Sequence, residues 1–426
     1  MDSETEASYR PSETTMRERL DELRPIPRIS VQAFCETAEV SAAISAAAAD
    51  RRMLKAHVHV NTGGIRAAAE HFASAPTPNL VILESKYPPA ELLEELEMLA
   101  DVCDPGSKVV IIGHYNDVSL YRELTRRGIS EYMLAPVHLA DIIAIVSQLF
   151  VAEGVEPLGR SMAFIGAKGG VGSSTIAHNV AWSISKLFST DVVLADLDLP
   201  FGTANMNFDK DPAQGIAEAV FSADRLDDVF LDRLLARCAD HLSLLAAPSA
   251  LDRTYDFETE AFSALIEAAR RGTPAVVLDV PHVWNDWTRS VLQRADEVVI
   301  TATPDLANLR NTKNLVDTLR KARPNDPPPR LVLNQVGMTK RPEIAVGEFV
   351  EPLGIEVLTT IAFDPLPFGM AANTGRMMGE TDAKHVANAA FAEIAYALTG
   401  RSSTKGQGAR AAKSAKGGLL ARIRRR

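Results

Sequence analysis

A glycine-rich stretch between residues 166 and 175, Gly-Ala-Lys-Gly-Gly-Val-Gly-Ser-Ser-Thr, constrains this chain more than any other segment. The apolar run from Met162 to Ile165 before it is typical of a buried strand, and apolar residues recur after it at helical spacing. A strand, a glycine loop and a helix in this order make a phosphate cradle. Glycines let backbone N–H groups converge on an anion, and the helix N-terminus adds its positive end. A glycine-rich turn in some other α/β protein is the alternative.

Two positions of the loop differ from the ordinary P-loop pattern. Ala167 stands at the first glycine position, and Ser173 stands where the phosphate-binding lysine is expected. The nearby lysine is Lys168, at the start of the loop. The hydroxyls of Ser174 and Thr175 stand where such loops offer a ligand to Mg²⁺ or to a phosphate oxygen.

Lys-Gly-Gly-Val-Gly followed by hydroxyl residues resembles the deviant Walker A loop of the ParA/MinD family of positioning ATPases. The resemblance implies that Lys168 is the signature lysine, which reaches across a dimer interface to the nucleotide of the partner. With Ser173 in place of the ordinary lysine, we expect binding of ATP and Mg²⁺ with slow or absent hydrolysis. The resemblance also implies that Ser174 binds Mg²⁺, that Thr175 contacts phosphate, and that backbone N–H groups of five residues hold the nucleotide: Gly169, Gly170, Val171, Gly172 and Ser173.

Two further apolar strands end in carboxylates. One delivers Asp196 and Asp198, and the other, Ala-Val-Val-Leu-Asp-Val, delivers Asp279. Ligands bind at the carboxyl ends of strands in doubly wound sheets. The resemblance to the ParA/MinD family implies a role for each residue. Asp196 supports the Mg²⁺ shell, and Asp198 positions the attacking water. Asp279 is the Walker B carboxylate beside a metal-bound water. Acidic residues that simply end strands are the alternative.

Three later segments extend the resemblance. Gly-Thr-Ala-Asn-Met-Asn at residues 202–207 matches the first switch region. Asn334 ends a strand, where the family's amide pairs with adenine, although a turn role is also open. Pro365 lies in the loop that closes over the base in the family.

Domain organisation follows from composition and periodicity. Residues 1–27 are polar and are expected to form a disordered leader. Residues 28–150 alternate between strand-like and helix-like segments in five βα units, which predicts a doubly wound parallel sheet. A linker at 151–160 precedes a second α/β domain at 161–400, and the composition then changes to a basic tail at 401–426.

The first domain resembles a response-regulator receiver, with Val-Ile-Ile-Gly-His-Tyr-Asn-Asp and Gly-Ile-Ser-Glu-Tyr-Met-Leu-Ala-Pro-Val as matching segments. Its phosphorylation residues differ from those of a working receiver. Glu84 replaces the acceptor aspartate, Ala135 replaces the lysine before the proline, and Glu36 alone remains of the acidic pair. We therefore expect a pseudo-receiver that serves in docking or dimerisation. The alternative for Glu84 is an ordinary strand-end carboxylate that faces solvent.

Charge is distributed unevenly over the 426 residues. Residues 401–426 carry nine Lys or Arg and no Asp or Glu, which leaves 36 basic against 55 acidic residues in the rest. An acidic body argues against nucleic-acid binding by the domains. The tail, with Leu419, Leu420 and Ile423 on one helical face, could contact an anionic membrane weakly, or it is a solubilising tail.

The remaining composition excludes other classes. No apolar run approaches the ~20 residues of a membrane span, and the N-terminal segment lacks the apolar region of a signal peptide, so we expect a cytoplasmic protein. The three cysteines match no metal-ligand spacing.

A pseudo-receiver followed by a ParA/MinD-like domain resembles the CpaE/TadZ pilus-assembly proteins. This resemblance implies a dimeric, nucleotide-dependent localisation factor for Flp (tight-adherence) pilus secretion at the cell pole, with the pilus secretion ATPase and other Flp/Tad proteins as partners. Two alternatives remain. One is an active ATPase that positions DNA or other cargo, and the other is a scaffold whose nucleotide pocket is vestigial.

Overall fold

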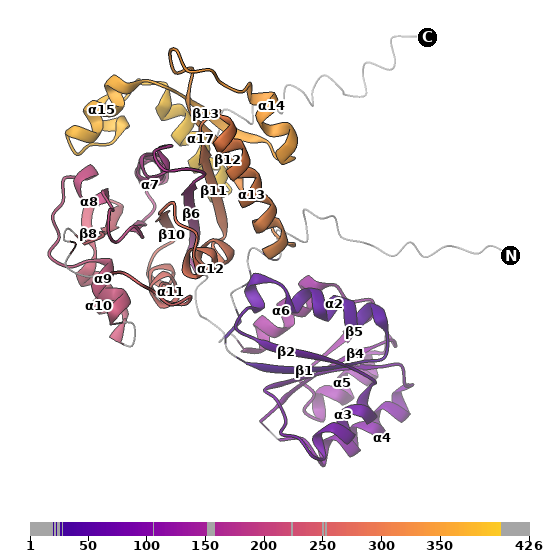
Figure 1. Cartoon of the computed structure of the whole chain (residues 1–426). Coiled ribbons are helices and arrows are strands. Elements are labelled where there is room, and N and C mark those ends of the chain that lie inside the picture. Colours follow the sequence, from indigo (N-terminus) through magenta and orange to yellow (C-terminus); the bar gives the residue numbers. More distant parts are fainter. Residues whose placement is uncertain are drawn as a thin grey trace, which may run out of the picture. The chain divides into compact units, whose positions relative to one another are not determined.

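The computed structural model describes residues 20, 23, 26–27, 29–104, 106–150, 158–222, 225–248, 251 and 254–401. The chain divides into two compact units (Figure 1), Met1–Pro157 with Arg323–Asp326 and Leu158–Ala322 with Pro327–Arg426. Most of the expected leader, most of the expected linker and nearly all of the basic tail lie outside the described residues. Within the described ranges, every helix is too short or too polar to cross a bilayer.

The first unit is a five-stranded parallel sheet with the strand order β2-β1-β3-β4-β5. This order is that of a flavodoxin-like doubly wound fold, as the five βα units predict. Its elements are β1 (Ser30–Cys35), α2 (Ala38–Ala48), η1 (Arg51–Met53), β2 (His57–Thr62), α3 (Ile65–Phe72), β3 (Leu80–Ser85), α4 (Pro89–Ala100), β4 (Lys108–Gly113), α5 (Val118–Arg126), β5 (Glu131–Leu134) and α6 (Leu139–Phe150).

Helices cover both faces of this sheet. One core forms between the sheet and α2 and α6, and the other forms between the sheet and α3, α4 and α5. The central strand β3 is buried along its whole length, which explains its continuous apolar run Leu-Val-Ile-Leu. Side chains cap two helix starts: Thr37 accepts a hydrogen bond from Val40 N at α2, and Asp117 accepts two at α5.

The second unit contains an eight-stranded sheet with the order β13-β12-β11-β6-β10-β7-β9-β8. The chain enters at its centre, because β6 pairs with both β10 and β11. Its elements are β6 (Arg160–Gly166), α7 (Ser173–Phe188), β7 (Val192–Asp196), α8 (Ala204–Asn207), α9 (Ile216–Phe221), α10 (Asp228–Leu234), β8 (Ala236–Ala239), β9 (Leu242–Leu245), α11 (Ser263–Gly272), β10 (Ala275–Val280), α12 (Asp286–Arg294), β11 (Glu297–Ala302), α13 (Leu306–Ala322), β12 (Arg330–Val336), α14 (Val346–Val350), η3 (Glu351–Leu353), β13 (Val357–Ala362), α15 (Pro365–Asn373), α16 (Met378–Thr381) and α17 (Ala387–Thr399).

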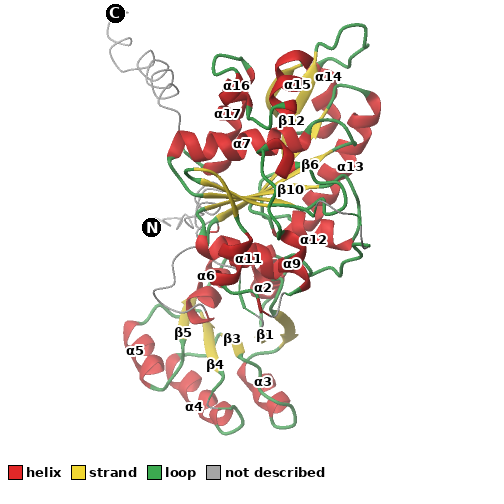
Figure 2. Cartoon of the chain, turned by 90° about the vertical axis from the view of Figure 1, so that its left-hand side faces the viewer, coloured by secondary structure: helices red, strands yellow, loops and turns green. Residues whose placement is uncertain are grey.

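Two hydrophobic cores lie on opposite faces of the second sheet. Figure 2 shows α7 and α17 on one side of the strands and α11 and α12 on the other. Both units are therefore doubly wound α/β sheets, which confirms the expected fold class. The hairpin β8–β9 was not expected: its strands pair antiparallel and make the edge of an otherwise parallel sheet.

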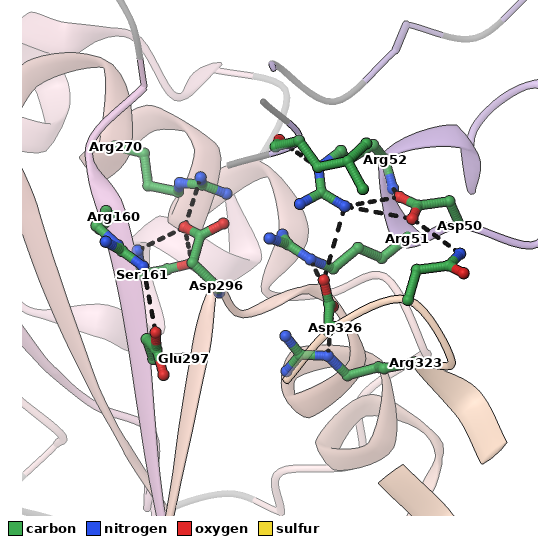
Figure 3. Close-up of polar contacts among 12 residues, drawn as sticks. Asp50, Arg51, Arg52, Arg160, Ser161, Arg270, Asp296, Glu297, Arg323 and Asp326 are labelled. Carbon is green, nitrogen blue, oxygen red and sulfur yellow. Dashed lines mark hydrogen bonds and ion pairs between the residues drawn. The ribbon is translucent and has the colours of Figure 1, made fainter. Parts of the chain in front are cut away.

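A polar anchor holds the start of the central strand (Figure 3). The Asp296 carboxylate, just before β11, accepts hydrogen bonds from Ser161 N (2.8 Å), Ser161 Oγ (3.0 Å) and Arg270 Nη2 (2.8 Å). Arg160 donates to Glu297 at 3.2 Å. At Gly159 a Cβ atom would lie 1.8 Å from the Thr273 carbonyl oxygen, so only glycine is accommodated where the chain enters this unit. The strand β6 is thus fixed at its start, and the glycine loop begins at its other, carboxyl end.

Candidate functional site

The glycine loop connects β6 to α7 at the carboxyl edge of the sheet. Gly170 and Gly172 have φ angles of 80° and 87°, in the left-handed region that favours glycine. At Gly172 a Cβ atom would also lie 2.5 Å from Asn334 Nδ2. Strand, loop and helix therefore follow one another as the sequence predicts, and two of the glycines are required by backbone conformation.

The loop leaves an open cradle. A Cβ atom built at Gly169 or at Gly170 would meet no described atom within 4 Å. Ser173, the first residue of α7, is 9% exposed, and its Oγ has no hydrogen-bond partner among the described residues. A buried hydroxyl at a helix N-terminus beside open backbone suits a phosphate group, which supplies the acceptors that the hydroxyl and N–H donors need.

Lys168 is exposed at the start of this loop. Its positive charge interacts with the carboxylate of Asp305, which lies in the turn between β11 and α13. Burial raises the pKa of the Asp305 carboxyl, but hydrogen bonds from Asn308 and Thr303, with a smaller contribution from Lys168, bring this pKa below its ordinary value. The loop's lysine is thus available at the surface.

Asp196 is the last residue of β7, and Asp279, the last residue but one of the neighbouring strand β10, is paired with it. Asp196 is 1% exposed and accepts hydrogen bonds from Asp198 N (3.2 Å) and Ala204 N (3.1 Å). Burial, followed by the charge of Asp279, raises the pKa of Asp196 to about 7, and His178 opposes this shift. Two carboxylates held together in a buried place favour a cation between or beside them.

Asp279 receives two hydrogen bonds from α7. Ser174 Oγ donates to its Oδ1 at 3.2 Å, and the Nε2 atom of His178 lies 3.1 Å from its Oδ2. The structure therefore brings together Ser174, Asp196 and Asp279, which the sequence analysis assigned to Mg²⁺.

Asp198 lies two residues beyond Asp196 and is half-buried. Its Oδ1 accepts a hydrogen bond from Phe201 N at 3.2 Å. Burial, with a contribution from the charge of Asp279, raises the pKa of Asp198 above its ordinary value. A carboxylate with a raised pKa at the edge of a phosphate cradle suits the handling of a proton from water.

Asn334 and its neighbour support the loop from β12. The Asn334 amide donates to the Val171 carbonyl at 2.8 Å, and the Gln335 amide donates to the Gly170 carbonyl at 3.0 Å. Pro365 is exposed and is the first residue of α15, one of the elements at the same sheet edge. The roles expected for Asn334 and Pro365 at a base remain predictions.

Sequence reasoning missed His178 and Asn207. His178 is 1% exposed in α7, and its Nδ1 atom lies 3.1 Å from Asn207 Nδ2 at the end of α8. The available signal was spacing: His178 follows Ser174 by four residues, which places both side chains on one helix face.

A second polar cluster lies in the receiver-like unit. Glu84 is fully buried, so the solvent-facing alternative is wrong. Its carboxylate accepts hydrogen bonds from the N–H groups of Glu36 and Thr37 (2.8 Å each) and from Thr37 Oγ1 (2.7 Å), and His114 Nε2 lies 3.0 Å away. The Glu84 carboxylate thus fills its pocket and accepts the hydrogen bonds that the surrounding groups donate.

Exposed apolar side chains surround the carboxyl edge of the second sheet. They come from the segments after β7, β10, β11 and β13 and are exposed by 37% to 73%. They are Phe201, Met206, Val283, Trp284, Leu306, Phe363, Leu366 and Met370. Exposed apolar patches of this kind are typical of surfaces that bind another protein, a membrane or a ligand.

Comparisons with known proteins agree with this geometry. Residues 159–328 match a family model described as an AAA domain. A solved ParA family ATPase from Chlorobium tepidum has a TM-score of 0.51 at 25% identity, over 55% of this chain and 98% of that chain. The septum site-determining protein MinD of Synechocystis sp. is 24% identical over 252 residues, which are 57% of this chain and 91% of that protein.

The fold and the glycine loop define a nucleotide-binding P-loop protein of the ParA/MinD class. A solved pilus assembly protein CpaE from Caulobacter crescentus is 46% identical to this chain, with a TM-score of 0.30, over 30% of this chain and 98% of that chain. On this sequence identity, the chain belongs to the family of CpaE pilus assembly proteins.

Proposed function

We propose that this protein is a nucleotide-dependent switch in pilus assembly, which binds ATP with Mg²⁺, dimerises and hydrolyses the nucleotide slowly or not at all. The observation that carries the proposal is the open cradle in front of Ser173, whose buried hydroxyl is unpartnered among the described residues where an ordinary P-loop presents lysine. A loop of this shape retains the backbone donors for phosphate and lacks the lysine charge.

Phosphate would be held by the backbone N–H groups of the loop and by two hydroxyls. Thr175 contacts phosphate, and the loop donors are those of Gly169, Gly170, Val171, Gly172 and Ser173. The left-handed conformations of Gly170 and Gly172 support this assignment, because they turn successive N–H groups toward one concavity.

Mg²⁺ would be held beside the phosphates by Ser174, with Asp279 and Asp196 as the carboxylates around it. Bound Mg²⁺ supplies charge neutralisation for the phosphates. Asp198, with its raised pKa, would orient a water molecule for attack. Adenine would pair with the amide of Asn334, and Pro365 would form a wall of the base site.

Slow turnover follows from the missing lysine. Hydrolysis needs positive charge on the phosphates as the transition state develops, and each preorganised donor supplies a large part of the rate. Ser173 provides a neutral hydroxyl in its place. Lys168 could supply charge across a dimer interface, and its exposure supports that use.

The dimer would form through the carboxyl edge of the second unit. Exposed apolar residues such as Trp284, Leu306 and Leu366 surround the site there. In the cell, the nucleotide-bound dimer would act in the cytoplasm at the pole, where the pilus secretion ATPase and other Flp/Tad proteins read its state. Any contact with an anionic membrane would go through the basic tail at 401–426, of which residues 402–426 lie outside the described residues.

Calorimetry with Mg-ATP, alongside light scattering, tests the proposal. We expect binding together with a shift from monomer to dimer. No binding at millimolar ATP would contradict the switch and leave a scaffold with a vestigial pocket. Nucleotide-dependent binding to DNA would instead favour an ATPase that positions DNA.

A further inference from the structure

A buried chain of side chains connects Asp279 to α8. His178 lies between Asp279 Oδ2 and Asn207 Nδ2, at 3.1 Å from each. The Asn207 amide nitrogen can only donate, so Nδ1 of the imidazole accepts and Nε2 carries the proton that is donated to Asp279. The order of donation is therefore Asn207 to His178 to Asp279.

The imidazole has little freedom to change partners. His178 is 1% exposed, so water cannot replace either hydrogen bond, and a buried ring nitrogen without a partner is costly. The ring of Phe208 packs against it with a centroid distance of 5.8 Å. A change in the orientation of the Asp279 carboxylate must then move the imidazole or break one of its two bonds.

The far end of the chain lies in the segment that also contacts Asp196. Ala204 N, at the start of α8, donates to Asp196 at 3.1 Å, and a Cβ atom at Gly202 would lie 2.4 Å from Asp196 Oδ2. The segment 202–207 is thus attached to Asp196 through its backbone and to Asp279 through His178. A movement of either carboxylate of the candidate metal site therefore affects the position of this segment.

We propose that His178 is a positioning residue that couples occupation of the nucleotide site to the conformation of segment 202–207. The proposal rests on the proposed function, because it assigns a read-out to the same site. His178 holds Asp279 in the orientation that a cation requires, and the state of Asp279 reaches Asn207 through the ring. By reciprocity, changes at Asn207 alter cation affinity at Asp279, which Asn207 does not itself touch.

The experiment measures the affinity of a fluorescent ADP analogue with and without Mg²⁺, in wild type, His178→Gln, Asn207→Ala and the double variant. His178→Gln introduces a side-chain amide in place of the ring, which can still donate to Asp279 but no longer connects it to Asn207. Hydrogen exchange of amides 202–208 is followed in the same samples. Asn179→Ala is the matched control in the same helix. It removes the hydrogen bond that Asn179 donates to Thr175 O and the one that it accepts from Met378 N, without touching Asp279 or α8.

We expect both single variants to lower the Mg²⁺-dependent gain in affinity by roughly 10- to 100-fold, as for residues that orient metal ligands, with affinity for the analogue alone retained. The double variant should be no worse than either single variant, because both break one connection. In wild type, Mg²⁺ with nucleotide should slow exchange at 202–208, and the variants should lose this effect. The control should keep both responses.

Two results would overturn the proposal in distinguishable ways. If wild type binds the analogue and Asn207→Ala keeps the full Mg²⁺-dependent gain in affinity, the role of His178 is overturned while the proposed function stands. No binding of the analogue by wild type would overturn the proposed function and the coupling with it. Asn207 is half-buried at the end of α8, so Asn207→Ala removes less packing than a change at His178 and tests the coupling where His178→Gln does not fold.

Discussion

Asp196 and Asp279 occupy paired positions on β7 and β10, and both are buried to 4% exposure or less. Two carboxylates in one buried place repel each other when both are ionised, and burial already disfavours their charge. The pKa of Asp196 is raised for these two reasons. The nucleotide-free protein therefore retains a costly pair of acids at the edge of its phosphate cradle, which is the arrangement that a cation stabilises.

Replacing Asp279 by Asn should make the free energy of unfolding less dependent on pH, because it removes the charge that repels Asp196. A carboxyl whose pKa is higher in the folded state loses folding stability as pH rises from its unfolded value toward its folded value. Removing the neighbouring charge lessens that loss, so the stability of Asp279→Asn relative to wild type should rise between pH 4 and pH 8. Urea unfolding of wild type and variant across this range measures the difference, and a difference that is independent of pH would contradict the repulsion.

Lys168→Ala should weaken nucleotide-dependent dimerisation by at least about tenfold, since truncating one partner of a desolvated charge pair is costly. The monomer should keep its melting temperature, because Lys168 is exposed. Light scattering with Mg-ATP measures the dimer. Lys186→Ala, an exposed lysine in the last turn of α7, is the control and should dimerise normally.

Ser173→Lys should restore charge at the ordinary P-loop position. We expect hydrolysis to rise by roughly 10- to 100-fold, because one preorganised donor on the phosphates is worth about this much or more. Steady-state phosphate release measures the rate. Ser173→Met adds similar length without charge and should give no increase. Equal rates in both variants would indicate that shape, and not charge, limits turnover.

Gly172→Ala should destabilise the second unit by about 1–2 kcal/mol, because an L-residue in the left-handed region is strained. Its Cβ would also press on Asn334 Nδ2. Gly169→Ala is the matched control in the same loop, with an open site for its Cβ and no positive φ. Chemical unfolding should separate the two variants, and equal stabilities would contradict the observed loop conformation.

Glu84→Gln should destabilise the receiver-like unit at pH 7 by about 1–3 kcal/mol, since an amide NH₂ would face donors that now point at carboxylate oxygens. Burial raises the pKa of Glu84, but its hydrogen bonds, first those from Thr37 and then those from His114 and Glu36, lower it below the ordinary value. The stabilisation is therefore present above the unfolded pKa of 4.5 and is lost as pH falls through the folded pKa.

Glu36→Gln is the control with the opposite sign. Burial and the charge of Glu84 raise the pKa of Glu36, despite a hydrogen bond from Lys86 N. Removing its charge should leave stability unchanged or increased at pH 7. Urea unfolding of both variants at pH 7 and pH 4 provides the comparison, and a loss at Glu36→Gln equal to that at Glu84→Gln would contradict these assignments.

The sequence by itself determined the alternation of strands and helices, the glycine loop and the carboxylates that end β7 and β10. These features are local: a buried parallel strand is a continuous apolar run, a helix repeats every 3.6 residues, and a glycine loop lies between them. Because the carboxyl ends of parallel strands share one edge, Ser174, Asp196 and Asp279 could also be expected to meet.

Only the tertiary structure decided which distant groups touch. Three features depend on contacts between segments far apart in the chain: the pairing of β9 with β7, the burial of Glu84 against Thr37 and His114, and the position of His178 between Asp279 and Asn207. No periodicity encodes such contacts, since they form only when packing closes the intervening loops and removes water from the polar groups.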